Sequence, residues 1–312
     1  MSNLVTDVKR LELETLKNLK SSKSNNTLRA YKADFKDFAL FCQQNGLNSM
    51  PSEPKIITLY LTHLSKSSKY STLKRRLASI SVIHRLNGHY LDTKHPVITE
   101  NLLGIKRVKG TYQKAKKPIL INELKLIVNA INKDKNQISR SKNKALLLIG
   151  FAGGFRRSEL VAILLDDVEF VSEGVKIFVK RSKTDQSGEG MTKGIPYFSS
   201  PDYCPVISLK NWIQEGKIKS GKIFDMSDKN VALTIKKYAA IAGLDKNKYS
   251  GHSLRSGFAT STAELGAEER SIMAMTGHKT TQMVRRYIKE ANLFKNNALN
   301  KIKIFIIYSN EF

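Results

Sequence analysis

Four short stretches of the chain carry side chains that could act together on a phosphodiester: GFRRSEL at 154–160, SKTD at 182–185, HSLR at 252–255 and TGHKTTQMVRRY at 276–287. They supply, in chain order, Arg156, Lys183, His252, Arg255, His278 and Tyr287. Arginine forks match the non-bridging oxygens of a phosphodiester and stay charged at any relevant pH. A tyrosine can be the nucleophile, and lysine or histidine can move the protons. The combination predicts a site that cuts phosphodiesters.

Each stretch by itself also has an ordinary structural interpretation. Arg156 could be surface charge paired with Glu159, three residues later on a helix. His252 and Arg255 share one helical face, as an ordinary surface pair would. Tyr287 fits an amphipathic stripe facing a core. The prediction therefore rests on all four stretches in their order, with Glu159 expected to orient a basic partner.

Three residues compete with this assignment. Tyr308 is a second candidate nucleophile, but it lies in an apolar segment without basic neighbours. Lys180 is close to Lys183 in sequence, and the register of a hairpin is hard to read there. Arg157 directly follows Arg156, and we prefer Arg156 for the site.

The elements that must position these groups are mostly helical. Residues 1–21 are charged and predict a short helix or a loose arm. An apolar stripe from Asn26 to Gly46, a helix after Ser52 and another near Ser71 predict an all-helical domain over 22–105. The first turns of its third helix carry Lys74, Arg75 and Arg76.

The second half of the chain mixes helices with a small sheet. Residues 106–118 have no apolar period and predict an extended, basic linker between domains. Residues 119–290 predict a mainly helical domain with an antiparallel sheet inserted over 166–198, and Lys183 at or just past a strand end. The segment 291–312 reads as a tail that docks on a neighbouring protomer, or alternatively covers its own.

Charge points to a polyanionic partner. The chain has 53 Lys and Arg against 27 Asp and Glu, a formal net charge of +26. Residues 54–91 and 101–122 contain basic residues but no Asp or Glu, as expected for a surface that tracks phosphates. A generally Lys-rich proteome is the alternative explanation. The candidate DNA contacts are Lys74, Arg75, Arg76, Lys109 and Lys116.

Other classes of site find little support. Two cysteines make a disulfide framework improbable, and no spacing suggests a metal site. GKIKSGK at 216–222 lacks the Ser or Thr of a phosphate-binding loop, since Ile223 follows it, so we predict no ATP. With no signal peptide and no apolar run long enough to span a bilayer, we expect a cytoplasmic protein that binds no membrane.

The chemically informative residues resemble those of the tyrosine recombinases, or phage-type integrases. That family has an Arg in a G-hydrophobic-R-x-S/A-E-L context, a Lys in a β-hairpin, His-x-x-Arg, a His or Trp, and a Tyr. The matches are Arg156, Lys183, His252, Arg255, His278 and Tyr287, and the last two are separated by the nine positions of the family pattern. The resemblance covers roughly residues 24–290.

The resemblance implies a two-domain architecture, with a SAM-like helical N-domain and a DNA breaking-rejoining catalytic domain that clamp duplex DNA. Tyr287 would attack the scissile phosphate, releasing a 5′-hydroxyl and leaving a 3′-phosphotyrosyl bond. Arg156 and Arg255 would brace the phosphate oxygens, and Lys183 would protonate the 5′-oxygen. His252 would manage the tyrosine proton and His278 would donate to the phosphate.

Because strand exchange joins two duplexes, the resemblance also implies a homotetramer in the synapse, with accessory DNA-bending proteins as further candidate partners. It implies no cofactor, metal or nucleotide. Two alternatives stay open: a type IB topoisomerase, which usually has a lysine where HSLR has its His, and a catalytically silent DNA-binding regulator.

Overall fold

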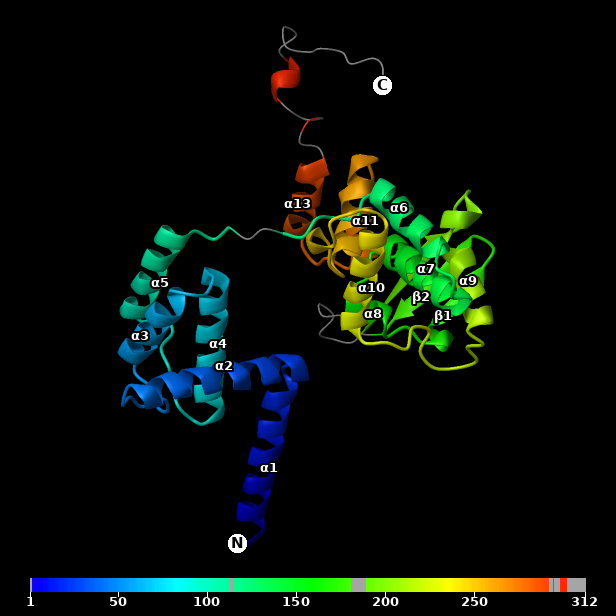
Figure 1. The fold of residues 1–312 in the computed structure, drawn as a ribbon. Coiled ribbons are helices and arrows are strands. Elements are labelled where there is room, and N and C mark those ends of the chain that lie inside the picture. Colours follow the sequence, from blue (N-terminus) through cyan, green and yellow to red (C-terminus); the bar gives the residue numbers. More distant parts are fainter. Residues whose placement is uncertain (1, 113–114, 181–188, 292–293, 295–297, 302–312) are drawn as a thin grey trace. The chain divides into compact units, whose positions relative to one another are not determined.

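The computed structural model describes residues 2–112, 115–180, 189–291, 294 and 298–301. The chain divides into two compact units, Met1–Lys114 and Ala115–Phe312, each with its own hydrophobic core (Figure 1). The division falls within the residues expected to link two domains.

The first unit is all helical in its described part. Its elements are α1 (Ser2–Ser21), α2 (Asn25–Gln44), α3 (Pro54–Ser65), α4 (Tyr70–Leu86) and α5 (Pro96–Lys109). Apolar side chains spaced by three and four residues meet in the core, where Phe38, Ile57 and Ile80 are fully buried. The stripes seen in the sequence are therefore the faces that pack together.

The predicted start of the linker, residue 106, is four residues too early. Residues 106–109 continue α5, which ends only where Gly110 adopts a φ of 69°. The helix persists because Ile98 and Leu102 are buried and Ile105 packs against the same core, a spacing that carries the helical face to its last turns. The extended part of the connection starts at Gly110.

The second unit combines helices with a small sheet, one face of which is buried in the core (Figure 1). Its helices are α6 (Ile121–Asn132), α7 (Gln137–Ala152), α8 (Arg157–Leu160), α9 (Pro205–Glu215), α10 (Asp228–Ile241), α11 (Ser253–Glu264), α12 (Glu269–Thr276) and α13 (Thr281–Ala291). Every residue of α7 from Ala145 to Ala152 is buried, so this helix forms the centre of the core. α11 approaches the core closely, because a Cβ on Gly257 would lie 1.9 Å from the Ile119 carbonyl oxygen.

The predicted small antiparallel sheet is confirmed. β1 (Val168–Val171), β2 (Gly174–Val179) and β3 (Met191–Pro196) pair antiparallel in the order β1-β2-β3. Alternation places Val175, Ile177 and Val179 of β2 on the buried face. On β3 the same face carries Ile195 and, unexpectedly, Lys193.

Candidate active site

Arg156 is presented by a tight turn between α7 and α8. The turn needs glycine at 154, where φ is +55° and a Cβ would lie 3.1 Å from both Phe258 and Thr276. The Glu159 carboxylate accepts hydrogen bonds from the Arg156 backbone nitrogen at 2.9 Å and from its Nη1 at 2.6 Å. Because Glu159 is only 4% exposed, this pair fixes the guanidinium at the base of the turn.

The neighbouring Arg157 faces a different part of the unit. Its Nη2 lies 3.6 Å from the Asp228 Oδ2, and its side chain covers Gly251. Arg156 instead points toward α12, where its Nη2 donates to the Gly277 carbonyl at 3.4 Å. Arg156 therefore lies beside Glu159 and Gly277 whereas Arg157 lies beside Asp228 and Gly251, and the assignment of Arg156 to the site stays a prediction.

Arg255 lies at the centre of the cluster and is only 1% exposed. Its Nη1 donates to the Gly154 carbonyl at 2.9 Å, and its Nη2 donates to Nε2 of His278 at 3.1 Å. Burial, followed by the charge of Arg156, lowers the pKa of Arg255 to about 10. Because both terminal nitrogens of this guanidinium already donate hydrogen bonds within the protein, the group is aligned before any substrate binds.

The hydrogen bonds of His278 define its tautomer. The Thr276 hydroxyl donates to the Ile272 carbonyl at 2.5 Å, so its oxygen is free to accept from His278 Nδ1 at 2.6 Å. Nδ1 therefore carries the proton, and Nε2 accepts from Arg255. Burial, followed by the charges of Arg255 and Arg156, lowers the pKa of His278 to about 4, so the free protein holds this ring neutral.

Tyr287 and His252 face each other across α11 and α13. Tyr287 is 4% exposed, and its hydroxyl lies 3.3 Å from Nε2 of His252. His252 keeps much of its surface in solvent, yet loss of water around the ring lowers its pKa, and Arg255 and Arg286 lower it further. A neutral imidazole within reach of a phenol can accept its proton.

Arg286 completes this corner and was not identified from the sequence. Its Nη2 donates to the Tyr287 hydroxyl at 3.1 Å, and its guanidinium carbon lies 5.0 Å from the centre of the tyrosine ring. A guanidinium at this distance can stabilise negative charge that develops on the tyrosine oxygen during a reaction. The hint available in the sequence was that two arginines, Arg285 and Arg286, directly precede Tyr287.

Lys183 lies outside the described residues, so its position stays a prediction. Its competitor Lys180 directly follows β2 and forms an ion pair with the buried Asp167, with Nζ 2.7 Å from Oδ1. Lys180 is therefore held beside the sheet.

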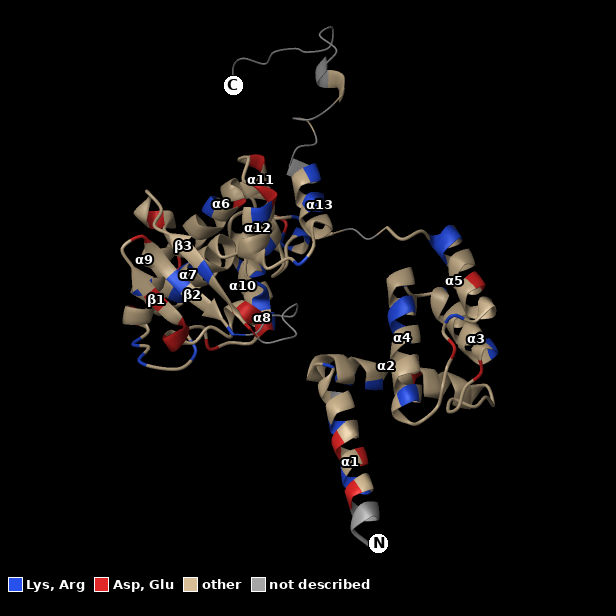
Figure 2. Cartoon of the chain, turned by 180° about the vertical axis from the view of Figure 1, so that it is seen from behind, with Lys and Arg blue, Asp and Glu red and all other residues tan. Residues whose placement is uncertain are grey.

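The basic residues of α4 divide into two kinds. Arg75 and Arg76 both pair with Asp34, which is 3% exposed, and Arg76 also reaches Asp37 at 3.0 Å. These two arginines have a structural role in addition to the DNA contacts expected of them. Lys74 is exposed, and α4 contains no acidic residue (Figure 2).

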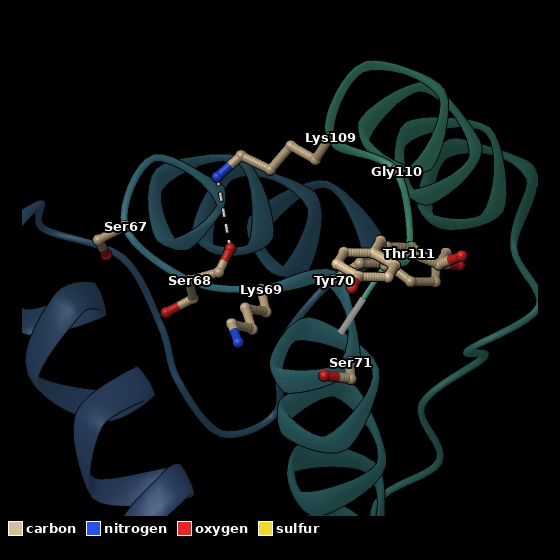
Figure 3. A pocket seen from close by; sticks show the side chains of 9 residues that line it. Ser67, Ser68, Lys69, Tyr70, Ser71, Lys109, Gly110 and Thr111 are labelled. Atoms are coloured by element: carbon tan, nitrogen blue, oxygen red, sulfur yellow. Dashed lines mark hydrogen bonds between the residues drawn. The ribbon is translucent and has the colours of Figure 1, made fainter. Parts of the chain in front are cut away.

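A basic hollow lies where the turn before α4 meets the end of α5. It has a volume of about 310 Å³ and is lined by Ser67–Ser71 and Lys109–Tyr112. Figure 3 shows the Lys109 side chain reaching across it to the Ser68 carbonyl, at 3.4 Å. Lysine and hydroxyl groups at the start of a helix form a surface suited to a phosphate.

The remaining candidate for a DNA contact, Lys116, lies in the second unit, where its Nζ donates to the Asn247 carbonyl at 2.6 Å.

The arrangement agrees with a known protein family. Residues 119–293, more than half of the chain, match the sequence profile of the phage integrase family. The chain belongs to the phage integrase family. It is a tyrosine recombinase, a DNA strand transferase of the kind that carries out site-specific recombination without metal or ATP.

Relatives and solved structures of this recombinase extend over most of its length. It is 40% identical over 277 residues to an integrase/recombinase xerD homolog of Selenomonas ruminantium, covering 84% of this chain and 81% of that protein. The XerH site-specific recombinase bound to difH substrate shares the fold, with a TM-score of 0.62 at 16% identity over 84% of this chain and 74% of that one. The Tn1549 transposon integrase in complex with circular intermediate DNA gives a TM-score of 0.60 at 15% identity over 85% and 90%.

The described part of the recombinase adds two further findings. Its residues contain no cluster of His, Cys, Asp or Glu able to hold a metal ion. Within the same residues, no helix is both long and apolar enough to cross a membrane.

Proposed function

We propose that this recombinase cleaves and rejoins duplex DNA at a specific site, with Tyr287 as the nucleophile. The observation that carries the proposal is the surroundings of its hydroxyl, which lies 3.3 Å from His252 Nε2 and 3.1 Å from Arg286 Nη2. The arginine and histidine pair, Arg255 and His278, adjoins it, with the His278 and Tyr287 rings 6.2 Å apart. A nucleophile, a proton acceptor and phosphate-binding cations thus share one corner.

The chemical step exchanges one phosphodiester for another. The Tyr287 oxygen forms a bond to phosphorus while the bond from phosphorus to the 5′-oxygen breaks. The tyrosine proton passes to His252, and the departing oxygen takes a proton, for which we assign Lys183. Resealing runs the same sequence in reverse, with a 5′-hydroxyl as the attacking group.

Arg156 and Arg255 would stabilise the charge that develops on the phosphate oxygens. In the free protein, Arg255 gives one donor to His278. A phosphate oxygen that takes this donor would leave His278 Nε2 without it, and the negative charge would raise the pKa of the ring. His278 could then become protonated and donate a hydrogen bond to the same phosphate.

For the DNA and the assembly, we propose that the phosphate backbone contacts Lys74, Lys109 and Lys116, and that four protomers join two duplexes. The exposed α4 lysine and the basic hollow support the backbone contacts. The segment 296–312, most of which lies outside the described residues, is the candidate for docking on a neighbouring protomer. Its deletion should abolish tetramers in gel filtration with DNA while leaving the monomer folded.

The experiment that tests the proposed nucleophile uses a suicide substrate, a nicked duplex library incubated without metal and analysed on a denaturing gel. The wild type should form a covalent protein–DNA adduct, and Tyr287→Phe should form none. Tyr308→Phe is the matched control, because it removes the rival hydroxyl and should leave the adduct unchanged.

The outcomes separate the candidate functions. Sequencing the trapped DNA should give one short site, whereas cleavage without sequence preference together with relaxation of supercoils would indicate a topoisomerase. Tight DNA binding without any adduct would indicate a silent regulator. Nothing in the described site or the relatives favours either alternative.

A further inference from the structure

Lys193 occupies a position that a core residue should hold. It is 1% exposed and sits on the buried face of β3, directly opposite Ile177 of β2 and two residues before the buried Ile195. A lysine there loses its hydration, a cost that a hydrocarbon side chain would not carry. Such a placement needs a compensating interaction.

The compensation comes from the turn that follows α7 and from the last turn of α12. Lys193 Nζ donates to the Gly153 carbonyl at 2.6 Å and also to the Met275 carbonyl. It lies 4.5 Å from the centre of the Phe155 ring. Each acceptor stands three residues before a site residue, since Gly153 precedes Arg156 and Met275 precedes His278.

The same two segments are also joined directly, because Arg156 donates to the carbonyl of Gly277, the residue that caps α12, at 3.4 Å. The Lys193 amino group therefore holds together, from the core side, the turn that presents Arg156 and the helix end that presents His278. We propose that Lys193 is a positioning residue for strand cleavage, which aligns Arg156 and His278 on the scissile phosphate without touching DNA.

The electrostatics fit this role. Burial lowers the pKa of Lys193 to about 7, with Glu159 opposing the shift and Arg255 and Arg156 adding to it. The charge on Lys193 is therefore stabilised by Glu159, which also holds Arg156, and is opposed by the charges of Arg156 and Arg255. A displacement of about 1 Å in such a site can cost about 100-fold in rate.

The test compares Lys193→Met, which keeps length and volume but has no N–H donor, with Ile195→Ala as a matched control on the same strand and face. The inference rests on the proposed cleavage by Tyr287, so the wild type is measured alongside. Single-turnover adduct formation on the suicide substrate should fall about 100-fold in Lys193→Met. Its Kd for DNA should stay within about threefold of wild type, because the lysine is buried away from DNA.

A second readout does not depend on cleavage. Carbon-13 NMR of labelled histidines in the free protein should show the pKa of His278 rising from about 4 toward its ordinary 6.5 in Lys193→Met, because the loops that hold its hydrogen bonds would loosen. Ile195→Ala should leave this pKa unchanged. If Lys193→Met does not fold by Trp212 fluorescence, Lys193→Gln, which keeps an N–H donor on a shorter side chain, takes its place.

The outcomes are distinguishable. Absence of an adduct with the wild type would overturn the proposed function, while the NMR result would still decide whether Lys193 positions His278. An adduct with the wild type, together with equal rates and equal His278 pKa in Lys193→Met and Ile195→Ala, would overturn only the role of Lys193.

Discussion

The clearest test of how the site is held together is Glu159→Gln. The carboxylate is 4% exposed and accepts two hydrogen bonds from Arg156, at 2.6 and 2.9 Å. Glutamine keeps the size and one acceptor oxygen but removes the negative charge beside Arg156, Arg255 and Lys193. Removing one partner of a buried ion pair costs about 3–5 kcal/mol. Because the Arg156 side chain is 18% exposed, we expect the lower end, about 3 kcal/mol.

Urea unfolding followed by the fluorescence of Trp212 measures this loss in the relevant unit. Trp212 is the only tryptophan of the chain and is buried in the second unit, so its signal reports that unit alone. With an m-value of about 2–3 kcal/mol/M, a loss of about 3 kcal/mol moves the midpoint down by about 1–1.5 M urea. Saturating duplex DNA should recover part of the loss, because a bound phosphate supplies negative charge to the same arginines.

The control is Glu169→Gln. That carboxylate pairs with Lys176 at 3.4 Å, but the two side chains are 66% and 50% exposed, so its loss should cost less than about 1 kcal/mol. If Glu159→Gln shifts the midpoint no more than this control does, the buried pair does not stabilise the site and the reasoning is wrong.

Three further predictions concern other groups. The pKa of His278 is lowered to about 4 from an ordinary 6.5, so the unfolded chain binds the proton first as pH falls, and stability is lost between those values. His278→Asn should therefore lose less stability than wild type between pH 6.5 and 4.5 in urea titrations, and equal losses would contradict this. Asp34→Asn should destabilise the first unit by about 3 kcal/mol in circular dichroism melts while the Trp212 transition stays in place; a shifted Trp212 transition would count against independent units. Lys74→Ala should reduce the slope of log K against log salt by about 0.9 on any DNA sequence, whereas Lys9→Ala, in α1, should leave it unchanged.

Much of this architecture could be predicted because it depends on the local spacing of apolar residues. Periods of three and four gave α2, α3 and α4, and alternation gave the small sheet. The structure also gathers Arg156, Arg255, His252, His278 and Tyr287 in one unit, although their roles stay predictions. These residues stood out because short motifs combine unusual residue types at fixed spacing.

Contacts across the fold could not be predicted in the same way. Asp34 holds Arg75 and Arg76 across about forty positions of sequence, and no local pattern reports that pairing. The sequence gives one indication that Lys193 is buried. It stands two residues before Ile195 on the same strand, so the two side chains lie on the same, buried face of the sheet. Because the chain has many lysines, this spacing does not single out Lys193 until the structure shows that the turn after α7 and the last turn of α12 supply the carbonyls that it binds.

Arg255, Arg156 and Lys193 each donate at least one hydrogen bond to a main-chain oxygen, and these acceptors belong to Gly154, Gly277, Gly153 and Met275. Every residue type supplies a backbone carbonyl, so an exchange of Met275 for another side chain would keep the acceptor in place. As sequences diverge, the donor side chains must be retained, whereas an acceptor position such as this one can drift as long as its backbone path is preserved. At an acceptor position like Met275, the network is therefore inherited through the path of the backbone, whereas its donors are inherited as side chains.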